Sequence, residues 1–139
     1  KTDARISTLL KFFNSHSYFN DLTNEDAEIA IDNHAGNVVF TDGMPHFIDI
    51  YLVKKEWRVI DRNNNIARLA TCIRVLGNND LANTVYETFE NHHKLAAKEV
   101  YQFLEAYNAF IKGYYYTYLQ QPDIAEKYFV FADSVIETL

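Results

Sequence analysis

Helix-breaking residues are scarce in this chain, and their scarcity restricts its possible folds more than any other feature. The 139 residues include only four glycines and two prolines. Because both residue types interrupt helices, long segments without them favour long helices. Apolar residues in these segments recur with helical spacing. We therefore expect helices at residues 4–13, 61–76, 79–92, 95–119 and 123–138.

The first of these segments has a clear apolar stripe. Residues 4–13 place Ile6, Leu9, Leu10 and Phe13 at positions i, i+3, i+4 and i+7. This spacing puts all four side chains on one side of a helix. We expect the helix to dock on the core through that side.

One segment has the character of strands instead. Val38-Val39-Phe40 and Phe47-Ile48-Asp49-Ile50 flank a short polar connection that contains Asp42-Gly43. An Asp-Gly pair between β-forming residues indicates a hairpin or another tight strand connection. The rest of the chain has no comparably clear β region.

Two corners of the helical half resemble each other. Leu76-Gly-Asn-Asn-Asp80 and Leu119-Gln-Gln-Pro-Asp123 lie 43 residues apart and are each followed by an aliphatic residue and an alanine. Each predicts a helix-turn-helix corner with its aspartate as the N-cap of the next helix. Helical repeat proteins need about three repeats to bury their faces. We therefore expect packed helical hairpins without a repeat function.

Size and charge narrow the classes of function. With 139 residues, 48% of them apolar, the chain suits one domain covering residues 1–139. Its net charge of −6 argues against a nucleic-acid partner or an anionic membrane surface, since both need clustered Lys and Arg. No apolar run approaches the roughly 18 residues of a membrane helix. The start of the sequence lacks both Met and an apolar signal segment, which suggests a fragment of a longer protein.

Cysteine usage indicates a reducing compartment. The single cysteine, Cys72, cannot form an internal disulfide and lies in an apolar helical run. We expect it to be a small buried side chain in a cytoplasmic protein.

The polar stretch before the hairpin carries residues suited to phosphoryl transfer. Asp32 precedes Asn37 by five residues, and Asp49 follows on the far side of the hairpin. Mg²⁺ prefers carboxylate and amide oxygens, and a further aspartate can accept or orient a hydroxyl proton. The catalytic loop of kinases has the same order: a base, a metal-binding asparagine, then a metal-binding aspartate.

The stretch resembles a family of small-molecule kinases. Ala30-Ile-Asp-Asn-His-Ala-Gly-Asn37, the hairpin and Asp49 are similar to the H-G-D-x-H-x-G-N loop, hairpin and aspartate of the aminoglycoside phosphotransferase and choline kinase-like family. Trp57-Arg58-Val59-Ile60-Asp61 and Asn65-Ile66-Ala67 continue the likeness, which spans roughly residues 30–120. The resemblance implies the C-terminal lobe of a protein-kinase-like fold, mainly α with one β-hairpin.

The resemblance also implies roles for individual residues. Asp32 would be the catalytic base, and Asn37 and Asp49 would bind Mg²⁺ and, through it, ATP or GTP. The acceptor would be a hydroxyl group of a small molecule, whose identity the sequence does not encode. The sequence does not indicate the oligomeric state either.

Two departures from the family pattern keep a second hypothesis open. Ala30-Ile31 replace the His-Gly of the family loop, and Asn65 replaces an aspartate. The four scattered glycines also form no glycine-rich phosphate loop, so the nucleotide-binding lobe would lie before Lys1. The alternative is a degenerate, non-catalytic kinase-like or helical-hairpin domain that binds a protein partner.

Several other polar residues have structural interpretations. His34 has no second histidine at helical spacing, so a structural hydrogen bond is favoured over metal binding. Asp61 is expected to be the N-cap of the following helix. His92 and His93 fit a solvated helix end. Tyr114, Tyr115 and Tyr116 would point in three directions about 100° apart on a helix, so they cannot form one stacking platform.

Overall fold

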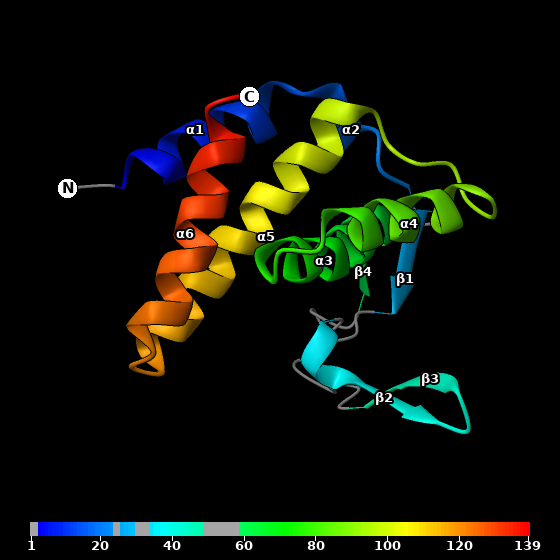
Figure 1. Cartoon of the computed structure of the whole chain (residues 1–139). Coiled ribbons are helices and arrows are strands. Elements are labelled where there is room, and N and C mark those ends of the chain that lie inside the picture. Colours follow the sequence, from blue (N-terminus) through cyan, green and yellow to red (C-terminus); the bar gives the residue numbers. More distant parts are fainter. Residues whose placement is uncertain (1–2, 24–25, 30–33, 49–58) are drawn as a thin grey trace. The chain divides into compact units, whose positions relative to one another are not determined.

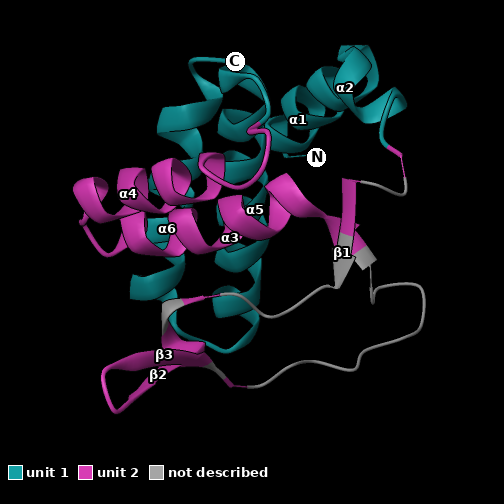
Figure 2. Cartoon of the chain, turned by 90° about the vertical axis from the view of Figure 1, so that its right-hand side faces the viewer, with its two compact units in different colours: residues 1–22, 96–139 teal, residues 23–95 magenta. Residues whose placement is uncertain are grey.

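The computed structural model describes residues 3–23, 26–29, 34–48 and 59–139. These residues group into two compact units (Figure 2). Unit 1 combines residues 1–22 with residues 96–139, and unit 2 contains residues 23–95. The chain is mainly helical and contains one small antiparallel hairpin, as the sequence predicted.

Unit 1 is built from four helices. They are α1 (Ala4–Ser15), the short α2 (Ser17–Asn20), α5 (Lys98–Tyr118) and α6 (Pro122–Ile136). The long helices begin and end within three residues of their predicted bounds. In Figure 1, α5 and α6 run side by side as a helical hairpin, and they make the most extensive contact between elements.

Small residues allow α5 and α6 to approach closely. Ala106 and Ala109 on α5, and Ala125 and Ala132 on α6, are at most 3% exposed. Gly113 lies directly against the aromatic ring of Phe129, and a Cβ atom there would come within 2.6 Å of that ring. The fit between this glycine and the ring therefore sets the local separation of the helices.

The packing of α1 differs in part from the prediction. Leu9 is buried, but Leu10 is 54% exposed and Phe13 is 46% exposed. Phe12, which lay outside the predicted stripe, stacks on Phe103 of α5 at 5.0 Å between ring centroids, and Phe13 lies 6.4 Å from the same ring.

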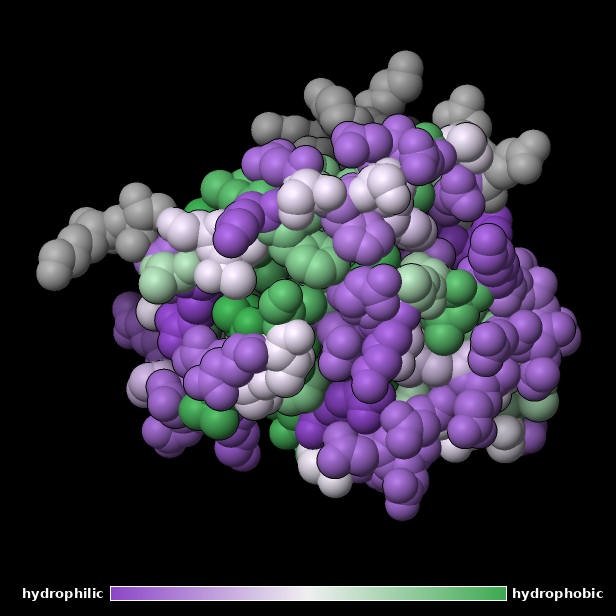
Figure 3. Space-filling model, turned by 90° about the horizontal axis from the view of Figure 1, so that it is seen from above, coloured by the Kyte–Doolittle hydropathy of each residue, from purple (hydrophilic) through white to green (hydrophobic). Residues whose placement is uncertain are grey.

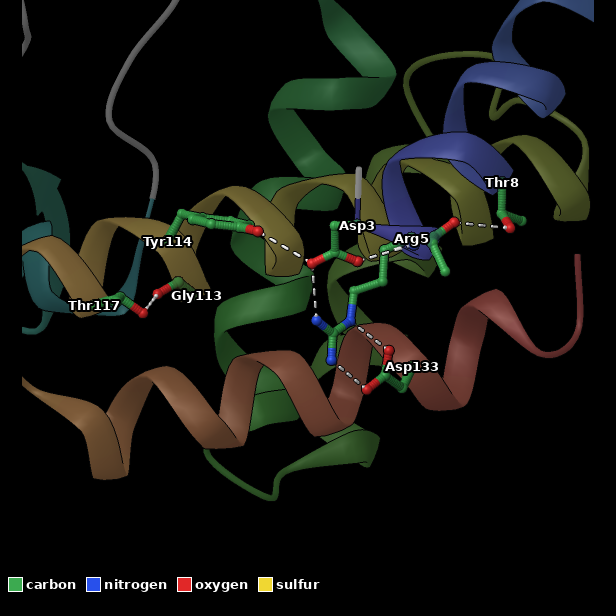
Figure 4. A network of polar contacts seen from close by, with 8 residues as sticks. Asp3, Arg5, Thr8, Gly113, Tyr114, Thr117 and Asp133 are labelled. Carbon is green, nitrogen blue, oxygen red and sulfur yellow. Dashed lines mark hydrogen bonds and ion pairs between the residues drawn. The ribbon is translucent and has the colours of Figure 1, made fainter. Parts of the chain in front are cut away.

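A polar network joins the start of α1 to α5 and α6 (Figure 4). The guanidinium of Arg5 donates two hydrogen bonds to Asp133 on α6, at 2.6 and 2.7 Å. It also donates to Asp3 at 3.2 Å, and the hydroxyl of Tyr114 donates to the same Asp3 oxygen at 3.0 Å. Asp3 in turn caps α1 by accepting the backbone N–H of Arg5. These contacts fix the first turn of α1 within unit 1.

Unit 2 contains two small antiparallel sheets. Strands β2 (Val38–Thr41) and β3 (Met44–Phe47) form the predicted hairpin. Its turn residues Asp42 and Gly43 have φ angles of 52° and 77°. Positive φ at both central residues is the requirement of the type I′ turn that Asp-Gly favours. Strands β1 (Ala27–Ile29) and β4 (Val59–Asp61) form a second pair, which the sequence did not reveal.

The described part of unit 2 also contains two α-helices. They are α3 (Arg62–Val75) and α4 (Asn79–Glu90), which pack together as a second helical hairpin. Ala67 and Ala70 of α3 and Ala82 and Tyr86 of α4 are buried. Cys72 is buried on α3, as predicted.

The two helical corners share one geometry. At the end of α3, the N–H groups of Gly77 and Asn78 donate to the carbonyls of Arg74 and Ile73. At the end of α5, Gln120 and Gln121 make the equivalent pair of hydrogen bonds, so both helices end in a Schellman motif. The predicted caps were wrong. Asn78 and Gln121 are the N-caps, and Asp80 and Asp123 lie in the first turns of α4 and α6.

The surface carries hydrophobic side chains among hydrophilic ones, as the space-filling view in Figure 3 shows for one face. On α5 alone, Ile111, Tyr115 and Tyr118 are 46%, 50% and 83% exposed. Among the described residues, no helix combines the length and the apolar character needed to span a membrane.

Candidate functional site

Asn37 is the predicted site residue that the structure describes in full. It is the last residue of the short 3-10 helix η2 (Ala35–Asn37) and directly precedes β2. Asn37 is 9% exposed, although asparagine is usually a surface residue. Asn37 is therefore a buried residue at the base of the hairpin.

Both backbone groups of Asn37 are hydrogen-bonded. Its N–H donates to the carbonyl of His34 at 2.9 Å, and its own carbonyl accepts from the N–H of Ile48 at 2.8 Å. The second bond extends the hairpin by one pair beyond Val38 and Phe47. The register of the hairpin thus brings Asn37 beside the residue that directly precedes Asp49.

His34 makes the structural hydrogen bond expected of it. Its ring nitrogen Nδ1 accepts the backbone N–H of Gly36 at 3.1 Å. His34 therefore accepts two successive N–H groups, one through its side chain and one through its carbonyl. The turn that leads into Asn37 is closed by this one residue.

The other two predicted site residues, Asp32 and Asp49, lie outside the described residues. In the part of the chain that the structure does describe, no three His, Cys, Asp or Glu side chains gather closely enough to hold a metal ion. Asp49, the second metal ligand that the resemblance implies, is one of these two residues.

Helix α3 supports the loop from within unit 2. It contacts η2, and its first turn contains the buried residues Asn63 and Asn65, which are 7% and 4% exposed. Asp61 caps this turn by accepting the N–H of Asn63 at 3.0 Å, as predicted. The burial of the asparagines was not predicted. The run of three asparagines at residues 63–65 is the sequence feature that could have indicated this burial.

Two groups of residues lie outside the candidate site: the histidines that follow α4 and the tyrosines of α5. His92 and His93 follow the end of α4 and are exposed, as predicted. Tyr114 and Tyr115 are 46% and 50% exposed, and the Tyr114 hydroxyl reaches Asp3 of α1. Tyr116 instead stacks on Tyr128 of α6 at 5.5 Å. Tyr115 and Tyr116 also meet edge-on at 5.5 Å, with their ring planes 70° apart, so the three rings form no common platform, as expected.

Comparisons with known proteins identify no relative of this chain. No family model, no curated protein and no solved structure matches it.

Proposed function

We propose that this chain is the C-terminal lobe of a small-molecule phosphotransferase with a protein-kinase-like fold. One observation carries the proposal: the 2.8 Å hydrogen bond from Ile48 to Asn37 at the base of the hairpin. The order Asp32, Asn37, hairpin, Asp49 suits phosphoryl transfer only if the hairpin folds the third residue back toward the second. The pairing of Asn37 with Ile48 is the register that this arrangement needs.

The proposed reaction assigns a role to each residue. Asp32 accepts the proton of the acceptor hydroxyl while that oxygen forms its bond to the γ-phosphorus of the nucleotide. The bond between the γ-phosphorus and the bridging oxygen breaks, and the nucleoside diphosphate leaves with the electron pair. Asn37 and Asp49 offer an amide and a carboxylate oxygen, which are donors that Mg²⁺ prefers. When bound, Mg²⁺ would neutralise charge on the phosphates of ATP or GTP.

A Mn²⁺ titration of the ¹⁵N-labelled chain tests the metal site. Mn²⁺ replaces Mg²⁺ in many oxygen-ligand sites and broadens nearby amide resonances. We expect broadening of residues 34–48 at submillimolar Mn²⁺, reversal by Mg²⁺, and loss of both effects in Asn37→Ala and Asp49→Ala. Asn14→Ala is the matched control, because Asn14 is exposed on α1 in unit 1.

The same experiment contains the refuting result. If millimolar Mn²⁺ produces no broadening that Mg²⁺ reverses, or if Asn37→Ala leaves it unchanged, the metal site and the proposed phosphoryl transfer are both rejected.

The exposed apolar side of α5 favours a second candidate, a non-catalytic domain that binds a protein partner. Ile111, Tyr115 and Tyr118 follow at helical spacing and are 46–83% exposed. This candidate predicts no specific Mn²⁺ binding at Asn37. The titration therefore separates the two functions.

A further inference from the structure

The hydrogen bond at the base of the hairpin determines which backbone groups of β2 point outward. The N–H of Ile48 donates to the carbonyl of Asn37 at 2.8 Å, so these two residues form a hydrogen-bonded pair. In an antiparallel ladder such pairs alternate with pairs that exchange no hydrogen bonds. Val38 and Phe40 belong to pairs of the second kind, so their N–H and C=O groups point away from β3. These groups form the outer edge of β2.

The outer edge of β2 is open. Among the described residues, β3 is the only strand that pairs with β2. All of residues 39–46 are exposed, and Phe40 is 72% exposed. An exposed edge strand is a template for pairing with another strand. The chemical complement of this edge is therefore an extended backbone.

The outer edge of β3 is blocked by a proline. Pro45 lies opposite Phe40 in the register, so its backbone nitrogen also points outward. Proline has no N–H to donate, and natural proteins use it to protect edge strands. The hairpin (Figure 1) can therefore accept a strand along β2 but not along β3.

We infer that β2 pairs with β2 of a second copy of this chain, which makes a four-stranded antiparallel sheet in the order β3-β2-β2-β3. The strand matches itself, because its sequence Val-Val-Phe-Thr is uncharged and consists of β-branched and aromatic residues. Such residues stabilise a sheet when they face each other on neighbouring strands, whereas like charges would destabilise it. A two-stranded sheet alone is marginally stable, and the two further strands of the second copy remove this weakness.

Twofold symmetry specifies one register for the contact. When the symmetry axis passes beside Val39, Phe40 of each copy lies opposite Val38 of the other. The two residues then exchange a pair of backbone hydrogen bonds. Both outer strands of the resulting sheet are β3, and each carries Pro45 on its outer side. The contact therefore closes at a dimer and does not continue into a filament.

The inference goes beyond the proposed function and does not depend on it. The backbone groups that pair belong to Val38 and Phe40, and neither residue has a role in the proposed phosphoryl transfer. A failure of the dimer thus leaves the proposed function untouched, and the Mn²⁺ titration leaves the dimer untouched.

Analytical ultracentrifugation of the chain tests the dimer and its cause. We expect a monomer–dimer equilibrium at about 10–500 µM, because so small an interface belongs to the weak class. Phe40→Pro removes an outward N–H but no hydrogen bond to β3, and we expect it to weaken the dimer about tenfold or more. Met44→Ala is the matched control, because Met44 is 64% exposed on the same hairpin but lies on β3. We expect it to change the dissociation constant by less than about twofold.

Two further substitutions keep this test decisive. Phe40→Lys retains every backbone group and brings a positive charge from each copy onto the paired strands, so it should also weaken the dimer. It replaces Phe40→Pro if the proline disturbs the hairpin. Pro45→Val restores the missing N–H on β3, and we expect assemblies larger than the dimer.

Cross-linking tests the register. The two Val39 residues would form a pair without hydrogen bonds, with Cα atoms about 4.5 Å apart, which a disulfide can span. In a Cys72→Ala background, Val39→Cys should therefore give a disulfide-linked dimer under mild oxidation. Thr41→Cys is the control, because the two Thr41 Cα atoms would be roughly 14 Å apart. Equal cross-linking of the two variants would overturn the register.

Three other results would overturn the inference. The first is a chain that stays monomeric at about 1 mM. The second is equal weakening of the dimer by Met44→Ala and Phe40→Pro, which would indicate non-specific apolar association. The third is a monomer whose Val38 and Phe40 amide resonances shift when a synthetic peptide of residues 37–41 is added, because the edge would then take an extended peptide instead of a second copy.

Discussion

Adding one methyl group at Gly113 should destabilise unit 1. The Cβ atom of Gly113→Ala would lie 2.6, 2.8 and 2.9 Å from three carbons of the Phe129 ring. Carbon atoms in ordinary contact are roughly 3.5–4.0 Å apart, so the ring or the helix must move by about 1 Å. Overpacking of this kind costs about 1–3 kcal/mol. A displacement of this size favours the upper part of that range.

The ring has limited freedom to move away. The guanidinium of Arg5 lies 4.9 Å from its centroid, and the ring of Tyr114 packs edge-on at 5.3 Å. Against the overpacking, alanine is about 1 kcal/mol more favourable than glycine inside a helix. The net loss in the free energy of unfolding should therefore be about 1–2 kcal/mol.

Urea unfolding followed by circular dichroism at about 222 nm measures this loss. The control is the same substitution in a Phe129→Leu background, where the smaller side chain leaves space. There Gly113→Ala should be neutral or stabilising by up to about 1 kcal/mol. An increase in stability in the wild-type background, or the same change in both backgrounds, would refute the account of α5–α6 packing.

Two further predictions concern the ends of helices. Hydrogen bonds from Arg5 hold the pKa of Asp133 below its usual value, so this pair stabilises the fold above about pH 4 and loses its effect as pH falls through the lowered pKa. Because the Asp133 side chain is 46% exposed, Asp133→Asn should cost only about 0.5–1 kcal/mol at neutral pH. The cost should be smaller at about pH 3, as measured by urea midpoints, and an equal cost at both pH values would contradict the pairing. Gln120 and Gly77 both have positive φ, 58° and 87°, so Gln120→Gly should stabilise by about 1 kcal/mol and Gly77→Ala should destabilise by a similar amount. Changes of the same sign in thermal melts would argue against the shared Schellman geometry.

Local sequence signals predicted most of the helical architecture. Few glycines and prolines, together with apolar periodicity, located the long helices because each helix depends mainly on residues within its own segment. The two corners were recognised from residue types that recur 43 positions apart, and the hairpin turn was recognised from the Asp42-Gly43 pair between β-forming residues. In each case the deciding interactions involve only a few neighbouring residues.

Features that depend on distant residues were not predictable in the same way. Strands β1 and β4 are three residues each, and they pair across 29 intervening residues. One partner of Arg5 is Asp133, 128 residues away in the sequence. The N-caps were misplaced for a different reason: Asn78 and Asp80 are both favoured cap residues, and only the backbone geometry distinguishes them.

The candidate site contains both kinds of feature, those that depend on neighbouring residues and those that depend on distant ones. The hydrogen bond of His34 and the cap at Asp61 are local, and the sequence predicted both. The burial of Asn63 and Asn65 depends on the packing of α3, which polar residue types alone do not indicate.

The division of the chain into units has a consequence for its biosynthesis. Unit 2 is one continuous stretch, whereas unit 1 joins α1, at the beginning of this sequence, to α5 and α6 at its end. A ribosome releases the chain from the N-terminus at about 5–20 residues per second, so unit 2 can fold while α6 is still being made. During those seconds α1 lacks α6, which carries the Asp133 partner of Arg5. The nascent α1 therefore exposes its apolar side until α5 and α6 emerge, and during this interval a chaperone would find the most apolar surface to bind.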